Sequence, residues 1–281
     1  MEIDSGLSYG SDYHFLPVTS IKSGAEDEVA TGVWCKTIQI VNICCISNQD
    51  DWVLIDAGMP RSADQIIEAC EARFGAGSKP KCIVLTHGHF DHVGAIIELV
   101  QLWKVPVYAH KLEMPYLTGA ESYPAPDPSV EGGMVAKLSF VFPVEPIQLG
   151  DWIKELPEDG SVPFLEDWRW LHTPGHAPGH ISLFREQDRV LIAGDAFVTV
   201  RQDSLYKVFT QEQEVHGPPR YLTTDWEQAK HSVYMLEQLQ PAVAVTGHGV
   251  PMRGERLAQG LKKLAADFDS LAVPDYGKYI Q

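Results

Sequence analysis

A histidine-rich loop between two apolar segments constrains the fold of this chain more than any other feature. The segment before the loop, residues 81–86, is a short apolar run that predicts a buried strand of a parallel sheet. The segment after it, residues 93–103, is apolar almost all round, which predicts a buried helix. The loop therefore follows a strand end, and ligands bind at that edge in open α/β sheets.

The loop carries four side chains that can bind metal ions: His87, His89, Asp91 and His92. Imidazole nitrogen and carboxylate oxygen are the ligands that zinc and similar cations prefer. Gly88 allows a bent backbone, so that His87 and His89 can face one ion. Asp91 and His92 then stand at the helix start, where they can serve a second ion or a water molecule.

Three later apolar runs repeat this arrangement, and each is followed by one candidate ligand. The pairs are residues 168–171 with His176, residues 190–193 with Asp195, and residues 242–245 with His248. His176 lies in a loop rich in proline and glycine, which favours irregular backbone over helix. Four strand ends that each carry a metal-type residue predict one shared metal centre.

These later residues also have ordinary structural interpretations. A single histidine beside an apolar segment commonly makes only local hydrogen bonds, and His172 and His180 flank His176 closely. Asp195 could cap a helix, and His248, between two glycines, could simply occupy a turn. The repeated pattern favours the metal site over these alternatives.

Hydrophobic periodicity predicts the remaining elements. Strands are expected at residues 38–47, 52–56 and 105–109, with a polar turn at 48–51. Helices are expected at residues 61–74, at 225–239 with a cap at Thr224 or Asp225, and at 256–268. Residues 118–144, rich in Pro and Gly, are expected to leave the core.

The composition fits a globular chain of 281 residues, of which 44% are hydrophobic. No linker, repeat or long charge run divides it, which predicts a single domain over 1–281. Neither a signal peptide nor a membrane span is predicted. The five cysteines lie mostly in apolar runs, so we expect buried thiols and a cytoplasmic location. The formal charge of −16, without a Lys/Arg cluster, argues against a nucleic-acid partner.

The histidine-rich loop resembles the His-x-His-x-Asp-His signature of the metallo-β-lactamase superfamily. Four further segments are similar to motifs of that family, in the family's order. They are LIDAG at 54–58, TPGH at 173–176, AGD at 193–195 and TGH at 246–248. The resemblance covers residues 38 to 250 or so, and this combination of motifs is highly specific.

The resemblance implies an α/β fold of four layers (αβ/βα): a sandwich of two mixed sheets flanked by helices, with the metals at one edge. Residues 118–146 would then be a surface insertion, and residues 253–281 a C-terminal helix and tail. His87, His89 and His176 would bind one metal, Asp91, His92 and His248 the other, and Asp195 would bridge them. Asp56 matches a buried aspartate behind the ligands, and Asn42 matches a recurring asparagine.

The implied chemistry is hydrolysis. Two close divalent cations can share a bridging hydroxide at neutral pH and polarise a carbonyl. This implies a dinuclear hydrolase that attacks an ester, thioester or lactone of a small molecule, with Asp91 or Asp195 handling the proton. No serine or cysteine nucleophile is needed, and no convincing Gly-x-Ser-x-Gly elbow is present. The His/Asp set favours two Zn²⁺ ions and also tolerates Mn, Fe or Co.

Within the family, the chain is similar to the glyoxalase II-type thioesterases and to the lactonases. Those lactonases carry a Tyr shortly after the bridging Asp, where Phe197 and Val198 stand here. We expect residues 118–144 and 201–220 to line the substrate pocket. Its candidate side chains are Tyr206, Phe209, His216 and Arg220.

The sequence leaves two alternative functions, and a possible homodimer, to be considered. An iron-dependent oxidoreductase, such as a persulfide dioxygenase, shares the fold but uses one iron with fewer ligands, so a full set of seven argues against it. A non-catalytic metal-binding or partner-binding protein would be expected to lack ligands, and none is missing. Exposed aromatic residues would suit a homodimer.

Overall fold

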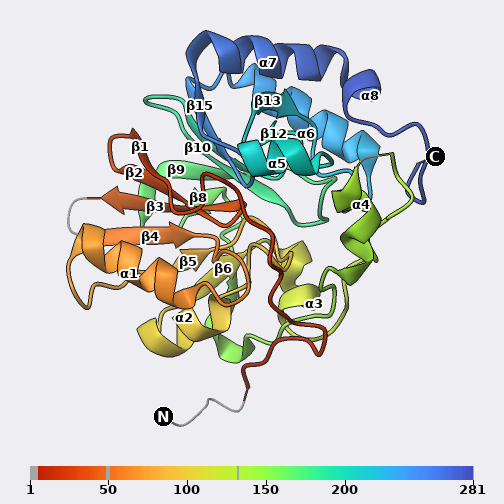
Figure 1. Cartoon of the computed structure of the whole chain (residues 1–281). Coiled ribbons are helices and arrows are strands. Elements are labelled where there is room, and N and C mark those ends of the chain that lie inside the picture. The colour runs from red at the N-terminus through yellow and green to blue at the C-terminus, as the bar shows by residue number, and fades with distance from the viewer. Residues whose placement is uncertain (1–5, 49–50, 132, 281) are drawn as a thin grey trace.

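The computed structural model describes residues 6–48, 51–131 and 133–280. Two mixed β-sheets lie face to face, and helices cover the outer face of each sheet, as Figure 1 shows. This is the sandwich that the family resemblance implies, with sheets as the inner layers and helices as the outer layers.

The first sheet has seven strands that follow one another in sequence order. They are β1 (Glu26–Ala30), β2 (Val33–Ile38), β3 (Val41–Asn48), β4 (Asp51–Ile55), β5 (Ile83–Val84), β6 (Val107–Ala109) and β7 (Ile153–Glu155). Neighbours from β1 to β4 are antiparallel, and neighbours from β4 to β7 are parallel. The helices that connect its parallel strands, α1 (Ala63–Phe74) and α2 (Ile96–Trp103), pack on its outer face.

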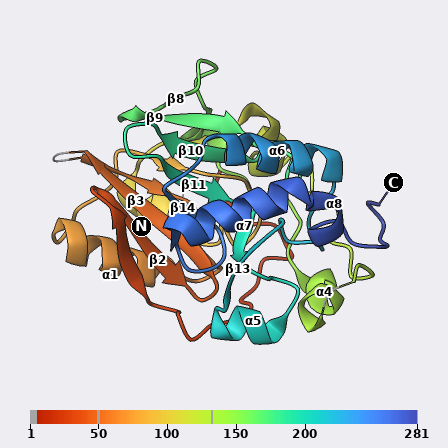
Figure 2. The ribbon, with the colours of Figure 1, turned by 90° about the horizontal axis from the view of Figure 1, so that it is seen from above.

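The second sheet has six strands in the order β15-β14-β11-β10-β9-β8. They are β8 (Ser161–Val162), β9 (Leu165–His172), β10 (Ile181–Arg185), β11 (Val190–Gly194), β14 (Val243–Thr246) and β15 (Met252–Arg253). Helices α6 (Trp226–Gln238) and α7 (Gly254–Ala266) cover its outer face, as seen from above in Figure 2. A separate two-stranded sheet pairs β12 (Val198–Val200) with β13 (Gln213–His216).

Short helices occupy the connections. They are α3 (Met114–Leu117), α4 (Met134–Leu138), α5 (Leu205–Thr210), α8 (Phe268–Leu271) and the 3-10 turns η1 (Lys111–Glu113), η2 (Ser139–Val141) and η3 (Gly150–Trp152). Among the described residues, no helix is both long enough and apolar enough to cross a membrane.

Alternation along the strands divides the core into layers. In β4, Leu54 packs under the helices of the first sheet, whereas Val53 and Ile55 face the second sheet. In β11, Leu191 packs under α6 and α7, whereas Ile192 faces the first sheet. Successive side chains of a strand point to opposite faces, so both faces of each sheet are buried. Each such side chain contributes about 1.5–3 kcal/mol of burial free energy.

The predicted strand over residues 38–47 is wrong at its beginning. β2 ends at Ile38 and β3 begins at Val41, because Gln39 turns the chain with a left-handed φ of 59°. The side-chain amide of Gln39 donates to the carbonyls of Leu16 and Val18, which stabilises the turn through distant residues. The predicted polar turn at 48–51 includes residues 49 and 50, which lie outside the described residues.

The predicted helices are found with shifted ends. Asp225 caps α6, since its side chain accepts a hydrogen bond from the backbone N–H of Gln228. The helix predicted at 93–103 begins only at Ile96, because the N–H groups of His92 and Val93 both donate to the carbonyl of His89 in a turn.

Residues 118–146 pack onto the loops that follow β12 and β13. The N–H of Asp127 donates to the carbonyl of Tyr221, and the N–H of Gly133 donates to the carbonyl of Asp203. Tyr123 in the same segment is buried. This segment therefore covers one edge of the sandwich.

Candidate metal centre

Four loops meet at one edge of the sandwich. β5 leads into the histidine-rich loop, and β9 leads into the loop of His176. β11 and β14 are parallel neighbours, so the residues that follow them, Asp195 and His248, lie at the same end of the sheet. All the predicted ligands are buried: His87, His89, Asp91, His92, His176, Asp195 and His248.

Three histidines form the first group of possible ligands. The ligand atoms of His87, His89 and His176 all lie within 4.8 Å of one another. His89 Nδ1 and His176 Nε2 are 3.0 Å apart. Two nitrogens at this separation can bind one cation, because zinc–nitrogen bonds are about 2.0–2.1 Å long.

A second group combines Asp91, His92 and His248, whose ligand atoms also lie within 4.8 Å of one another. His248 Nε2 is 3.2 Å from Asp91 Oδ2. Asp195 lies between the two groups, with its Oδ2 3.5 Å from His176 Nε2 and 3.3 Å from His248 Nε2. The structure thus brings all seven predicted residues together, and the ligand atoms of His87, His92 and Asp195 form a third group within 4.8 Å of one another.

Buried atoms without hydrogen-bond partners show that these residues fit cations. Eight buried side-chain N and O atoms have no partner among the described residues, and four of them belong to this centre. They are His87 Nε2, His92 Nε2, Asp91 Oδ1 and Asp195 Oδ1. An unpartnered buried polar atom costs about 1–3 kcal/mol, so such a cluster calls for a ligand. Imidazole nitrogen and carboxylate oxygen without thiolate suit zinc, manganese, iron or cobalt.

Hydrogen bonds behind the imidazoles hold them in place. Asp56 Oδ2 accepts from His92 Nδ1 over 2.8 Å, as expected for the buried aspartate. The carbonyl of Ile40 lies 3.0 Å from His248 Nδ1. Thr223 Oγ1, which donates to a backbone carbonyl, lies 3.2 Å from His176 Nδ1. Such partners fix the ring orientation and leave the opposite nitrogen free for a metal.

The three-histidine group is neutral at physiological pH in the metal-free protein. Burial, followed by the neighbouring imidazoles, lowers the pKa of His87 well below its ordinary value. Burial also lowers the pKa of His89 to about 4 and that of His176 well below the ordinary value. These imidazoles are therefore ready to bind a cation.

In the second group, Asp91, His92 and His248, both imidazoles are charged in the metal-free protein. Burial would lower the pKa of His248, but the carboxylates of Asp195 and Asp91 reverse this and raise it to about 10. His92 behaves in the same way: burial opposes its charge, and Asp56, Asp91 and Asp195 hold its pKa well above the ordinary value. Protons on these imidazoles occupy the place of a cation.

The neighbouring histidines have other roles. His172 stacks on His110 with ring centroids 4.2 Å apart, away from the ligand group. His180 Nε2 accepts a hydrogen bond from the backbone N–H of Asp195 over 2.8 Å. Asn42, matched by resemblance alone, donates to the carbonyls of Thr246 and Gly249 and so holds the loop of His248.

The four candidate pocket residues divide into two exposed and two buried side chains. Tyr206 and Phe209 are exposed, whereas His216 and Arg220 are buried. The guanidinium of Arg220 donates to the carbonyls of Leu271 and Ala272 and to Glu131. It is therefore occupied by structural contacts.

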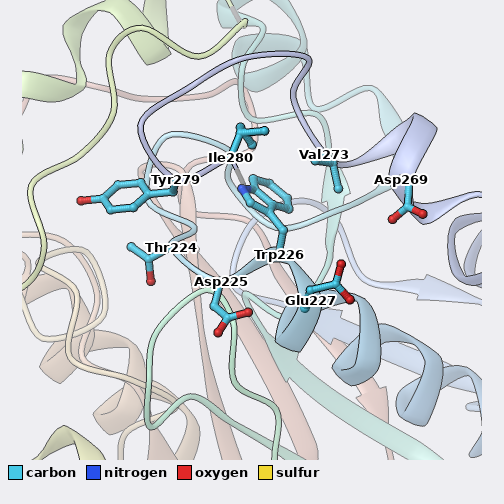
Figure 3. Close-up of a pocket in the computed structure, with 8 residues that line it drawn as sticks. All are labelled: Thr224, Asp225, Trp226, Glu227, Asp269, Val273, Tyr279 and Ile280. Atoms are coloured by element: carbon cyan, nitrogen blue, oxygen red, sulfur yellow. The ribbon is translucent and has the colours of Figure 1, made fainter.

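A pocket of about 430 Å³ lies between the start of α6 and the C-terminal segment. Figure 3 shows Asp225 and Trp226 on one side of it and Tyr279 and Ile280 on the other. None of the predicted ligands lines this pocket. Its wall residues Thr224 and Asp225 follow Thr223, the partner of His176, and their N–H groups donate to the carbonyl of Gly175, the residue before His176.

Comparison with known proteins identifies the family. The profile described as "Metallo-beta-lactamase superfamily" matches residues 38–248. "Probable metallo-hydrolase YflN" of Bacillus subtilis (strain 168) is 51% identical over 260 residues, which cover 92% of this chain and 98% of YflN. This chain belongs to the metallo-beta-lactamase superfamily, and its four-layer fold is the fold of that family. It is thus a member of a superfamily of metal-dependent hydrolases.

Two more distant similarities are to a hydrolase, over part of the chain, and to a solved structure. "Hydroxyacylglutathione hydrolase GloC" of Haemophilus influenzae is 31% identical over 118 residues, which cover 41% of this chain and 49% of GloC. The crystal structure of TTHA1623 in a di-iron-bound form aligns with a TM-score of 0.52 at 24% identity, over 78% of this chain and 93% of that one. The latter similarity shows a shared fold.

Proposed function

We propose that this protein is a hydrolase that uses two divalent metal ions to cleave an ester, thioester or lactone bond of a small molecule. The main support is the buried set of seven side chains, His87, His89, Asp91, His92, His176, Asp195 and His248, whose ligand atoms form overlapping groups within 4.8 Å. The unpartnered atoms of this set give the two ions a place to bind.

Bound divalent cations would lower the pKa of a water molecule toward neutrality and polarise the carbonyl of the substrate. The residues of the chain would hold these ions and accept the proton that hydrolysis releases. Burial would raise the pKa of Asp91, but His92 and His248 hold it below its ordinary value, so the carboxylate stays ionised. Asp91 has two carboxylate oxygens, of which Oδ2 lies 3.2 Å from His248 Nε2 and Oδ1 has no hydrogen-bond partner among the described residues, so one can contact a cation while the other takes up a proton during hydrolysis. Asp195 is the second candidate for this role.

Among the three bond types, we place the thioester first. GloC, which is similar to part of this sequence, is named a hydroxyacylglutathione hydrolase, and an acyl group on the thiol of glutathione is a thioester. Phe197 and Val198 are fully buried, and neither carries the hydroxyl that lactonases of this family place after the bridging aspartate. The five cysteines are free and buried, and none of them belongs to the groups of ligand atoms at the centre.

Zn²⁺ is the first choice for both metals, on the chemistry of the donor set, with Mn, Fe and Co as the other candidates. TTHA1623 holds two irons on a similar fold. We also propose a cytoplasmic location, since the five thiols form no disulfide. The homodimer stays a prediction, which the mass of the protein in solution tests.

A substrate panel on protein of known metal content tests this function. The expected result is metal-dependent hydrolysis of at least one ester, thioester or lactone, lost on chelation and restored by Zn²⁺. Asp195→Ala should reduce turnover by more than the factor of about 10–100 that is typical when a partner behind a ligand is lost. Full metal loading without hydrolysis would support a binding protein instead. One iron per chain with persulfide oxidation would support the oxygenase alternative.

A further inference from the structure

We infer that Glu113 is a positioning residue that joins the two loops of the three-histidine site, with Tyr123 as its partner. This inference rests on the proposed function, because it concerns the same centre. Glu113 lies at the end of η1 and is 0% exposed.

The carboxylate of Glu113 bridges two loops that are far apart in the sequence. Its Oε2 accepts from the N–H of Gly88 over 2.9 Å, and its Oε1 accepts from the N–H of Gly179 over 2.7 Å. Gly88 lies between His87 and His89, and Gly179 follows His176 by three residues. One side chain therefore ties together the loops whose nitrogens, His89 Nδ1 and His176 Nε2, approach to 3.0 Å.

Tyr123, in the segment 118–146, makes a further contact with both Glu113 and Gly88. Its hydroxyl donates to Glu113 Oε2 and accepts from the N–H of Gly88 over 2.9 Å. Its ring packs against the His89 imidazole with centroids 4.5 Å apart. Tyr123 thus holds both the backbone and the ring of this loop.

The two glycines provide independent support for a close contact. A Cβ on Gly88 would lie 2.6 Å from the Tyr123 hydroxyl, and a Cβ on Gly179 would lie 2.7 Å from Glu113 Cγ. Neither glycine has a left-handed φ, so backbone conformation alone does not require glycine there. The close approach of Glu113 and Tyr123 explains why both positions lack a side chain.

Only a carboxylate satisfies this arrangement. Three donors converge on Glu113, namely the N–H of Gly88, the N–H of Gly179 and the hydroxyl of Tyr123. A glutamine of the same shape has one acceptor oxygen, and its NH₂ group would face an N–H group on the other side. Glu113→Gln should therefore release one of the two loops while it preserves volume and burial.

The test measures metal binding. Purified protein is stripped of metal and titrated with Zn²⁺ in competition with a chromophoric chelator, and with Co²⁺ to record its visible absorption bands. The variants are Glu113→Gln, Tyr123→Phe and the control Asp127→Asn. Asp127 is also a buried carboxylate of the covering segment, but it accepts from Ser129 and Lys278 and contacts neither ligand loop.

We expect Glu113→Gln to weaken Zn²⁺ binding by a factor of about 10–100 and to shift the Co²⁺ bands, as when partners behind metal ligands are lost. Tyr123→Phe should weaken binding less, and Asp127→Asn should bind as the wild type does. A folded Glu113→Gln protein with wild-type affinity and spectrum overturns the inference. If Glu113→Gln does not fold, Tyr123→Phe decides: weaker binding than Asp127→Asn supports the inference, and equal binding overturns it. Failure of the wild type to bind two divalent cations would instead contradict the proposed function.

Discussion

His92 Nδ1 donates a hydrogen bond to Asp56 Oδ2 over 2.8 Å, and both side chains are buried. Asp56 also accepts from the backbone N–H and the hydroxyl of Thr86, over 2.7 and 2.8 Å. Thr86 Oγ1 in turn lies 3.1 Å from His87 Nδ1. One carboxylate therefore orients a histidine of each proposed metal site, and it leaves the Nε2 atom of both rings free.

Asp56→Asn should weaken metal binding by a factor of about 10–100, because the amide offers one acceptor oxygen to three donors. Metal content after dialysis against a chelator measures this effect. Asp64→Asn, on the exposed start of α1, is the matched control and should bind two metals. Wild-type affinity in Asp56→Asn would contradict the role of this carboxylate.

Two histidines of one loop should behave differently. His176→Ala should lose about one metal ion per chain, because the ring belongs to the three-histidine group. His172→Ala should retain both ions, because His172 stacks on His110 and contacts the carbonyl of Pro178. Metal stoichiometry by atomic emission compares the two variants. Equal metal loss in both would contradict the assignment of ligands in this loop.

Metal affinity should rise with pH, because a bound metal displaces protons from the second group. His248 has a pKa raised to about 10 in the metal-free protein, so it is charged at neutral pH and must lose its proton. Calorimetric titrations in buffers of different ionisation enthalpy should show proton release on binding at pH 7. Absence of proton release, with affinity constant between about pH 6 and 9, would contradict the charged state of this group.

The stability of the metal-free protein should change with pH in the opposite direction. The pKa of His248 in the folded protein is about 10 and exceeds the ordinary value of 6.5. The charged imidazole therefore makes its full contribution to the free energy of unfolding below pH 6.5, and this contribution is lost as the pH rises through about 10. Thermal unfolding of metal-free protein across this range measures the decline. Saturating Zn²⁺ should remove most of it, because the metal replaces the proton.

Arg220 should affect stability rather than substrate binding. Arg220→Met leaves the carbonyls of Leu271 and Ala272 and the carboxylate of Glu131 without a donor. We expect the free energy of unfolding to fall by about 3 kcal/mol, which is near the lower limit for breaking a buried ion pair. The value lies at the lower limit because the Glu131 side chain is 32% exposed, so water can solvate it once Arg220 is gone. Urea unfolding measures it, with Arg253→Met, which breaks an exposed pair with Asp27, as control. Unchanged stability with a raised KM would contradict this role.

The sequence predicts the metal centre better than its surroundings. The ligands follow apolar strands, and parallel strands such as β11 and β14 deliver their ends to one edge, so a local pattern suffices to group them. The turn at Gln39 could not be predicted, because its left-handed conformation is stabilised by contacts with Leu16 and Val18. Glu113 and Thr223 were missed for the same reason: hydrogen bonds between distant segments leave no periodic pattern in a sequence.

The central claim is that the seven side chains hold two cations, and anomalous diffraction from a crystal of Zn²⁺-loaded protein tests it most directly. We predict two peaks at the zinc edge, about 3.5–4 Å apart as in other two-metal sites. One peak should lie among His87, His89 and His176, the other among Asp91, His92 and His248, with Asp195 between them. A single peak, or peaks away from these side chains, would contradict the account.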